Sequence, residues 1–332
     1  SFIDVPTAAD CFEYFGSLEH PWGDRVNPVV DAPVRSVTAF EPMGVVACII
    51  PWNYPLIMAA WKMAPALLAG NSVVFKPSSV GCASVMRLAQ IIKESGLPPG
   101  VVNIVATTNK EAARLLVTDK DVDMVSFTGG TKTGQEIMRL ASQTTKKLSL
   151  ELGGKSPNIV FGDCDLEAAV GGTMSAIFMN QGQMCTAGSR LLLEESIYNK
   201  FMKLLIEKTK QLKIGNALDY QTEFGPVISR EQQQKALKCI EEAVKQGATI
   251  ACGGRIPAVG AQNFVPLRGF YLEPTILENV TNKMKVAQEE IFGPVLAVIK
   301  FKDEQQAVSI ANDSDFGLAA CAWTKDLAKA DR

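Results

Sequence analysis

Residues 44–76 read GVVACIIPWNYPLIMAAWKMAPALLAGNSVVFK, and this stretch decides the fold. Its first seven residues form an apolar run that predicts a buried strand over 44–50. Residues 56–68 follow a helical pattern, and residues 72–76 again read as a strand. A strand, a helix and a second strand in this order predict a βαβ unit with parallel strands.

The same alternation continues along the rest of the chain. Further strands are predicted at 101–105, 124–128, 148–151, 156–161, 190–194, 295–301 and 319–323, and further helices at 84–94, 110–117, 134–141, 165–179, 196–210, 230–246 and 303–311. Such alternation predicts an α/β fold whose parallel sheet carries helices on both faces. A glycine pair at 153–154 permits a hinge, so the domain boundary is placed there. Residues 255–269 are predicted to form a surface loop.

The composition excludes several classes of protein. Thirty-three basic and 35 acidic side chains give a formal charge of −2, which argues against nucleic acid as a partner. No apolar run approaches the ~18 residues of a membrane span. Eight scattered cysteines without a CxxC pair favour a reducing, cytoplasmic setting. A single histidine, His20, excludes a multi-histidine metal site, and no metal is predicted.

Both ends of the sequence indicate a fragment. The chain starts at Ser1 without an initiator methionine, and it stops at Arg332 inside a helical pattern. A length of 332 residues still suggests about two domains.

Four loops carry polar or glycine residues where a doubly wound sheet binds its ligands, and each is expected to follow a strand. They are PWNYP at 51–55, FKPSS at 75–79, FTGGTKTG at 127–134 and NQGQMCTAG at 180–188. The Asn53 amide either donates to an oxyanion or only caps the next helix. Lys76 either binds ribose or phosphate groups or is solvated.

Cys185 differs from the other cysteines because it lies in a polar, glycine-bounded loop that could expose and tune a thiol. Cys48 and Cys321 lie in apolar runs and are predicted to be small core residues. A cysteine nucleophile needs a base, which here must be a carboxylate or a lysine. Glu151 is a candidate because it ends an apolar strand, where a carboxylate is costly unless functional or paired. An ordinary salt bridge is the alternative for Glu151.

Six motifs occur in the order used by the aldehyde dehydrogenase superfamily, which the chain resembles from about residue 27 to its end. They are PWNYP at 51–55, FKPS at 75–78, FTGGT at 127–131, ELGGKSP at 151–157, GQMC at 182–185 and EEIFGP at 289–294. The resemblance is to the hydrolytic, NAD(P)-dependent members. It implies an aldehyde-dehydrogenase-like α/β fold, with a Rossmann-type parallel sheet in a cofactor domain and a second α/β catalytic domain.

The resemblance also implies how the chain is divided. Residues 1–23 and 43–153 would form the cofactor domain, 24–42 a bridging or oligomerisation strand segment, and 154–332 the catalytic domain. The full-length protein would be a homo-oligomer, either a dimer or a tetramer.

By this resemblance Cys185 is the nucleophile, which attacks a small-molecule aldehyde to form a thiohemiacetal. Asn53 and the backbone N–H of Cys185 would form the oxyanion hole. Hydride transfer to NAD or NADP would leave a thioester, and Glu151 would activate the water that hydrolyses it to a carboxylic acid.

The resemblance assigns twelve residues to the cofactor. They are Ile49, Ile50, Pro51, Trp52, Lys76, Ser78, Ser79, Gly129, Gly130, Leu152, Glu290 and Phe292. Ser79 stands where the family often has a Glu that binds the adenosine-ribose hydroxyls. Because the repulsion of a 2′-phosphate by that Glu is absent, NADP is expected to be accepted as well as NAD.

Tyr54, Met58 and Trp61 lie at i, i+4 and i+7, a spacing that places them on one helix face, and in the family that face lines the substrate tunnel. Core packing is the alternative. If they line a tunnel, its apolar and aromatic entrance suits a medium aliphatic aldehyde or a quaternary ammonium aldehyde held by cation–π contacts.

Three other functions stay open. A dehydrogenase could pass the acyl group to coenzyme A, although that route needs no carboxylate such as Glu151. A non-catalytic descendant could keep the fold, although Cys185, Glu151 and Asn53 are intact. A thiol redox sensor would need a resolving cysteine, and none lies near Cys185 in the sequence.

Overall fold

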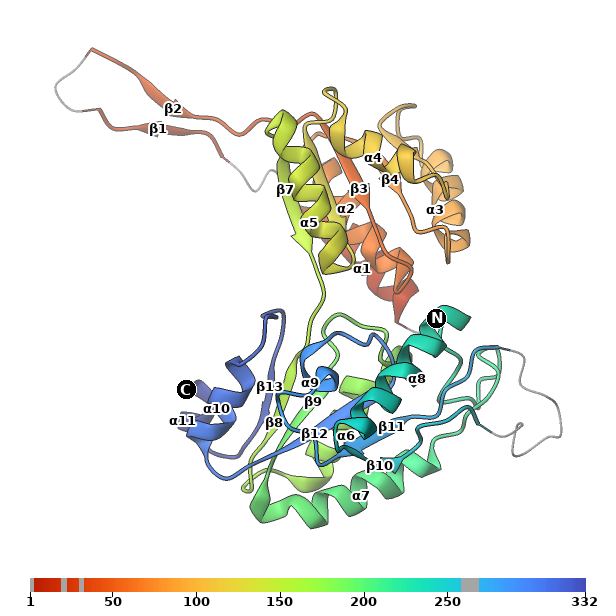
Figure 1. The fold of residues 1–332 in the computed structure, drawn as a ribbon. Coiled ribbons are helices and arrows are strands. Elements are labelled where there is room, and N and C mark those ends of the chain that lie inside the picture. The colour runs from red at the N-terminus through yellow and green to blue at the C-terminus, as the bar shows by residue number, and fades with distance from the viewer. Residues whose placement is uncertain (1–2, 19–22, 30–32, 258–268) are drawn as a thin grey trace. The chain divides into compact units, whose positions relative to one another are not determined.

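The structure is a computed structural model that describes residues 3–18, 23–29, 33–257 and 269–332. The chain divides into two compact units, residues 1–152 and 153–332 (Figure 1). This division falls beside the predicted glycine boundary, and the functional roles of the two domains remain predictions. His20 and most of the loop predicted at 255–269 lie outside the described residues.

Unit 1 is built on a five-stranded parallel sheet with the order β5-β4-β3-β6-β7. Its strands are β3 (Val45–Ile49), β4 (Ser72–Lys76), β5 (Val102–Ile104), β6 (Met124–Thr128) and β7 (Lys147–Glu151). Its helices are α1 (Asp4–Ser17), α2 (Pro55–Leu68), α3 (Ala83–Glu94), α4 (Lys110–Thr118) and α5 (Thr131–Ala141), with a short 3₁₀ turn, η1 (Ser142–Thr144).

Strand β3 shows how the sheet of unit 1 is covered on both faces. Val46 and Cys48 pack with residues of α2 and α3, whereas Ala47 and Ile49 pack with residues of α4 and α5. Because successive side chains of a strand point to opposite faces, a continuous apolar run is required here. The predicted doubly wound arrangement and the predicted burial of Cys48 are confirmed.

Two parts of unit 1 carry no strand–helix alternation in the sequence. Helix α1 packs against α2, and Phe12 of α1 reaches the apolar cluster beneath α2. Strands β1 (Arg25–Asn27) and β2 (Ser36–Thr38) form a separate antiparallel pair. In the described part of the chain, no helix is long and apolar enough to cross a bilayer.

Unit 2 is built on a six-stranded sheet with the order β10-β11-β12-β9-β8-β13, parallel except for the β10–β11 pair. Its strands are β8 (Pro157–Val160), β9 (Arg190–Glu194), β10 (Thr249–Cys252), β11 (Thr275–Glu278), β12 (Val295–Phe301) and β13 (Cys321–Trp323). Its helices are α6 (Leu166–Phe178), α7 (Tyr198–Gln211), α8 (Arg230–Lys245), α9 (Lys285–Gln288), α10 (Glu304–Asn312) and α11 (Leu327–Asp331), with 3₁₀ turns η2 (Met179–Gly182) and η3 (Glu195–Ile197).

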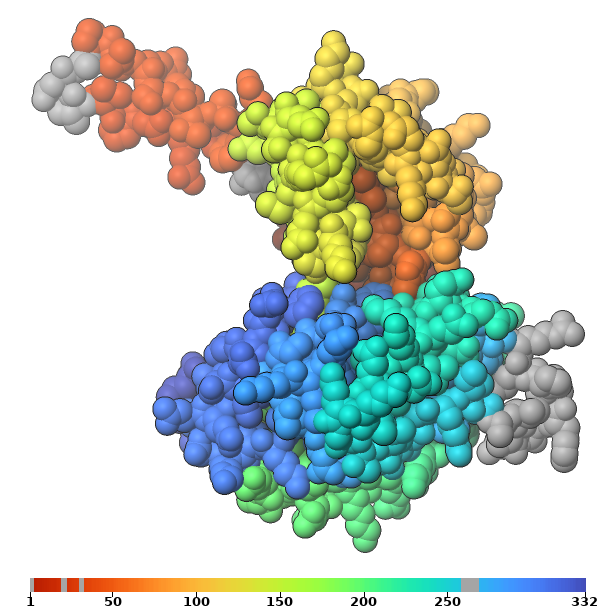
Figure 2. All heavy atoms as spheres, viewed as in Figure 1, coloured from red at the N-terminus to blue at the C-terminus, as the bar shows by residue number. Residues whose placement is uncertain are grey.

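Helices cover both faces of this second sheet. Residues of α6 and α7 pack on one face, and residues of α8, α9 and α10 pack on the other. The outer side of α8 forms part of the visible surface of unit 2 (Figure 2). The prediction that Cys321 lies in a core is wrong, because β13 is an edge strand that pairs only with β8, and the Cys321 side chain is exposed.

Candidate active site

The polar loops of unit 1 gather at the carboxyl ends of its parallel strands. From β3 the chain runs outward through β4 to β5 and then returns to β6 on the other side of β3. In doubly wound sheets ligands bind beside such a reversal, outside the carboxyl ends of the strands. Loop 51–55 follows β3, loop 77–82 follows β4, and the turn at 129–130 follows β6. The structure therefore brings these three sequence-predicted loops to one edge.

Asn53 occupies a fixed place in the loop after β3. Its side chain is only 5% exposed. The next residue, Tyr54, has a left-handed backbone with φ +52°, which turns the chain sharply into α2. The amide of Ile50 donates to the carbonyl of Lys76 at 3.2 Å, so the start of the loop is tied to the sheet.

The residues predicted to bind the cofactor in unit 1 differ in exposure: Ile49 and Ile50 are buried, whereas those after β4 and β6 are more accessible. Lys76 is half-buried, and its Nζ donates to the carbonyl of Pro77 at 3.3 Å. Ser79 is exposed. Gly130 occupies the N-cap position of α5, and the N–H groups of such a first turn suit an anion.

Glu151 and Leu152 end unit 1. Leu152 packs against the first turn of α5 at Gly134, and the carbonyl of Glu151 accepts the amide of Gly129 at 3.0 Å. The Glu151 side chain is exposed because β7 is the edge strand of the sheet. The expectation of a costly buried carboxylate is therefore wrong, although the proposed role of Glu151 does not depend on burial.

Sequence reasoning missed Lys62, a buried lysine on α2. Its Nζ donates to Ser126 Oγ at 2.9 Å, and burial lowers its pKa. Cys48 and, to a smaller extent, Glu151 favour the charged form of Lys62 and partly offset this lowering of its pKa. In the sequence Lys62 is one residue of an apolar helix, and nothing local marks it as buried.

The predicted site loops of unit 2 lie at the amino ends of its parallel strands, whereas those of unit 1 lie at the carboxyl ends. Residues 153–156, 182–189 and 289–294 each lead into one of the neighbouring parallel strands β8, β9 and β12. The expectation that the Cys185 loop follows a strand is therefore wrong. This loop follows helix α6 and η2, so Cys185 lies before the amino end of β9.

The backbone before Cys185 is strained. Asn180, Gln181 and Gly182 have consecutive left-handed conformations, with φ of 49°, 56° and 68°. Two of these residues are not glycine, and such conformations persist only where the surroundings hold them. Gln183 is one such support, because its Oε1 accepts the amide of Ile228 at 2.8 Å and its Nε2 donates to the carbonyl of Asn180 at 3.0 Å.

Two glycines let other motifs approach this loop closely. A Cβ on Gly182 would lie 2.3 Å from the carbonyl oxygen of Gly293, and a Cβ on Gly154 would lie 2.2 Å from that of Cys185. Both distances are far below ordinary contact. The loop from Gly182 to the half-buried Cys185 thus lies between the glycine motif at 153–154 and the motif at 289–294.

Glu290 faces the same glycines. Its Oε1 accepts the amide of Gly154 at 3.2 Å. Burial raises the pKa of Glu290, and this hydrogen bond together with Lys235 and Lys155 opposes the rise. Phe292, two residues later, has a left-handed backbone with φ +61°.

Two buried cations beside these loops were also missed from the sequence. Arg190 is 1% exposed, and its Nε donates to the carbonyl of Lys155 at 2.9 Å. Its terminal nitrogens donate to the carbonyls of Ile310 and Ala311. Lys155 is 2% exposed, its Nζ has no hydrogen-bond partner among the described residues, and burial lowers its pKa to about 8.

The three residues predicted for a substrate tunnel have different surroundings. Met58 is buried in the core of unit 1, which favours packing for this residue. Tyr54 is half-buried, and 56% of Trp61 is exposed. A tunnel role for Tyr54 and Trp61 remains a prediction.

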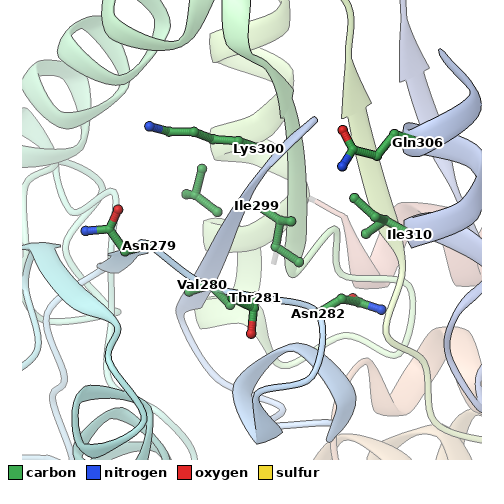
Figure 3. A pocket seen from close by; sticks show the side chains of 9 residues that line it. Asn279, Val280, Thr281, Asn282, Ile299, Lys300, Gln306 and Ile310 are labelled. Carbon is green, nitrogen blue, oxygen red and sulfur yellow. The ribbon is translucent and has the colours of Figure 1, made fainter. Parts of the chain in front are cut away.

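A separate pocket in unit 2 takes no part in this site. It is lined by residues of β12, of α10 and of the segment after β11, as Figure 3 shows: Asn279, Val280, Thr281, Asn282, Val298, Ile299, Lys300, Gln306 and Ile310. None of the predicted site residues lines it. Within the described ranges, no cluster of three His, Cys, Asp or Glu side chains could hold a metal ion.

Comparison with known proteins places these motifs in a family. The sequence profile of the aldehyde dehydrogenase family matches residues 1–332. The chain is 43% identical to a betaine aldehyde dehydrogenase of Bacillus subtilis and 41% identical to a retinal dehydrogenase 2 of Homo sapiens, with 100% and 99% of the chain covered. It covers 67% and 62% of these two relatives.

A solved structure agrees with the sequence comparison. The betaine aldehyde dehydrogenase of Staphylococcus aureus, in complex with NAD+, is 41% identical to this chain and matches it with a TM-score of 0.94. The match covers 99% of this chain and 65% of the Staphylococcus chain. By its profile, its relatives and its fold, the chain belongs to the aldehyde dehydrogenase family.

Proposed function

We propose that the full-length protein oxidises an aldehyde to a carboxylic acid with NAD or NADP and uses Cys185 as its nucleophile. The observation that carries this proposal is the strained loop of Cys185, which is held between the motif at 153–154 and the motif at 289–294. Strain of this kind gathers at functional sites. Membership of the aldehyde dehydrogenase family supports the same reaction.

In the proposed reaction the Cys185 thiolate forms a bond to the aldehyde carbon. The resulting oxyanion accepts hydrogen bonds from Asn53 and from the backbone N–H of Cys185. NAD or NADP, when bound, supplies the acceptor for the hydride. The adduct on Cys185 thereby becomes a thioester, and Glu151 takes a proton from the water that adds to it. The C–S bond then breaks, and the carboxylic acid leaves.

Each unit, taken by itself, offers groups that suit part of a dinucleotide. In unit 1, the first turn of α5 after Gly130 offers N–H groups for a pyrophosphate, and half-buried Lys76 offers an ammonium group for ribose oxygens. In unit 2, Glu290 offers one carboxylate oxygen that is bonded to Gly154 and a second for ribose hydroxyls. Exposed Ser79 carries no charge that would repel a 2′-phosphate, so we propose that both cofactors are accepted.

The aldehyde itself is proposed only as a class. Relatives named for betaine aldehyde, retinal and aminoaldehydes are 43%, 41% and 43% identical to the chain, so identity favours none of them. Exposed Trp61 provides an aromatic surface suited to an apolar or quaternary ammonium aldehyde. We propose that the enzyme acts on one of these two kinds of substrate.

The proposal is tested by Cys185→Ala in the full-length protein. We expect this change to abolish NADH or NADPH formation from betaine aldehyde, an aminoaldehyde, retinal and hexanal, because no other group replaces the thiolate. Cofactor affinity should stay within about threefold, since the nucleophile does not hold the dinucleotide.

The matched control is Cys321→Ala, which removes an exposed cysteine from edge strand β13 and should leave turnover unchanged. Retained turnover in Cys185→Ala would contradict the proposal. Acyl-CoA as the product after addition of coenzyme A would replace hydrolysis with the acylating alternative.

A further inference from the structure

Helix α2 begins without a cap from its own neighbourhood. The N–H groups of a first helical turn need acceptors from outside the helix. Tyr54, at the N-cap position, has a left-handed backbone, and its side chain accepts no cap hydrogen bond. The helix's own ladder starts at Met58, whose amide donates to the carbonyl of Tyr54 at 3.0 Å. The amides of Leu56 and Ile57 therefore need another acceptor.

Asp4 supplies that acceptor from a distant part of the chain. Its Oδ2 accepts the amide of Leu56 at 3.3 Å, and its Oδ1 accepts the amide of Ile57 at 3.0 Å. The residue is half-buried in the first turn of α1, which packs along α2. A carboxylate is the favoured acceptor here, because charge strengthens both bonds and the amino end of a helix attracts negative charge.

The loop that carries Asn53 thus has an anchor at each end. At its start the amide of Ile50 is bonded to the carbonyl of Lys76 in β4. At its end the first turn of α2 is bonded to Asp4. We propose that Asp4 is a positioning residue for Asn53: by bonding the first turn of α2, it fixes the direction in which the loop presents the Asn53 amide.

This inference rests on the proposed function, in which Asn53 donates to the oxyanion. Such a donor acts only when it is held within a fraction of an ångström of its working place. A loose first turn of α2 would let the loop move, and a misplacement of about 1 Å can cost up to ~100-fold in rate. Asp4 should therefore affect the rate of the chemical step more than the affinity for the cofactor.

The experiment uses Asp4→Ala and Asp4→Asn in the full-length enzyme, assayed well below the thermal midpoint of each variant. We expect kcat to fall about tenfold in Asp4→Ala and about threefold in Asp4→Asn, since asparagine keeps one acceptor oxygen. The KM for NAD should stay within about twofold in both. The control Asp10→Ala removes an exposed carboxylate from the same helix and should leave kcat unchanged. An unchanged kcat in Asp4→Ala overturns the inference.

The same variants are then made in an Asn53→Ala background, which separates positioning from general stability. Once the Asn53 amide is gone, Asp4→Ala should lower kcat no further. An equal loss in both backgrounds would make Asp4 a structural residue only and overturn the inference. If Asn53→Ala alone leaves kcat unchanged, the oxyanion assignment fails together with this inference. If Asp4→Ala does not fold, Asp4→Asn provides the same comparison.

Discussion

The two units place their functional loops at opposite ends of parallel strands. In unit 1 the loops follow β3, β4 and β6, at the carboxyl ends of the strands where doubly wound sheets bind their ligands. In unit 2 they precede β8, β9 and β12, and backbone packs directly against backbone. At Gly130 in unit 1 an added Cβ would meet no atom within 4 Å, whereas at Gly182 and Gly154 in unit 2 it would meet a backbone carbonyl oxygen.

Glycine-to-alanine substitutions test this comparison, and they are expected to give the largest change in kcat. In Gly154→Ala the new Cβ would lie 2.2 Å from the carbonyl oxygen of Cys185, so the nucleophile loop must shift by about 1 Å. We expect kcat to fall ~100-fold, because the reacting group is misplaced by that shift. Steady-state kinetics of the full-length enzyme measure this loss.

Two control glycines sharpen the same measurement. Gly130 in unit 1 and Gly171 in α6 have no atom within 4 Å of an added Cβ, and neither has a left-handed backbone. We expect Gly130→Ala and Gly171→Ala each to change kcat less than about threefold, because neither new methyl group displaces a neighbour. A loss in Gly130→Ala as large as that in Gly154→Ala would contradict the difference between these two positions.

Buried lysines provide a second, smaller contrast. Lys62 in unit 1 is bonded to Ser126 Oγ, whereas Lys155 in unit 2 has no hydrogen-bond partner among the described residues. Burial of the protonated Lys155 is unfavourable because the ammonium group loses its hydration, and this lowers the pKa of Lys155 to about 8. Lys155→Met should therefore stabilise the protein at pH 7 by on the order of 2–3 kcal/mol.

The pH dependence of the free energy of unfolding tests whether the protonated Lys155 destabilises the protein. In the folded protein Lys155 loses its proton near pH 8, whereas in the unfolded chain it keeps the proton up to its ordinary pKa of 10.5. The unfolded state thus binds more protons between these values, and the wild type gains stability relative to Lys155→Met as the pH rises through them.

Urea midpoints at pH 7 and pH 10 measure the difference in the free energy of unfolding between the wild type and Lys155→Met. This difference should be smaller at pH 10. Lys62→Met is the control and should not stabilise, because it leaves Ser126 without its partner. Destabilisation by Lys155→Met at pH 7 would count against an unpaired buried ammonium group.

Much of the secondary structure of unit 1 is predictable because short stretches of its sequence indicate each strand and helix. The apolar runs and the helical pattern between 44 and 76 predict β3, α2 and β4 to within about one residue. Cys185 stands out by its polar, glycine-bounded loop alone. The exposure of Glu151 and Cys321 was missed because it follows from the order of strands, which places β7 and β13 at sheet edges.

Other residues could not be found because their role lies in long-range contacts. Asp4 resembles any acidic residue at a helix start, and only the structure reveals that it bonds amides more than 50 residues away. Arg190 begins the apolar strand β9 and Lys155 precedes β8, and neither apolar run gives a sign of a buried charge. The left-handed run at 180–182 includes two residues that are not glycine, so composition does not signal its strain.

The central claim, that Cys185 carries the acyl group, is tested most directly by trapping that group. Full-length Glu151→Gln is mixed with aldehyde and NAD, quenched with acid and digested, and the peptide that contains Cys185 is weighed by mass spectrometry. Because the variant lacks the base that activates water, we predict one NADH per site and a matching acyl thioester on Cys185. NADH formed without acylated Cys185, or with the acyl group on another cysteine, would contradict the account.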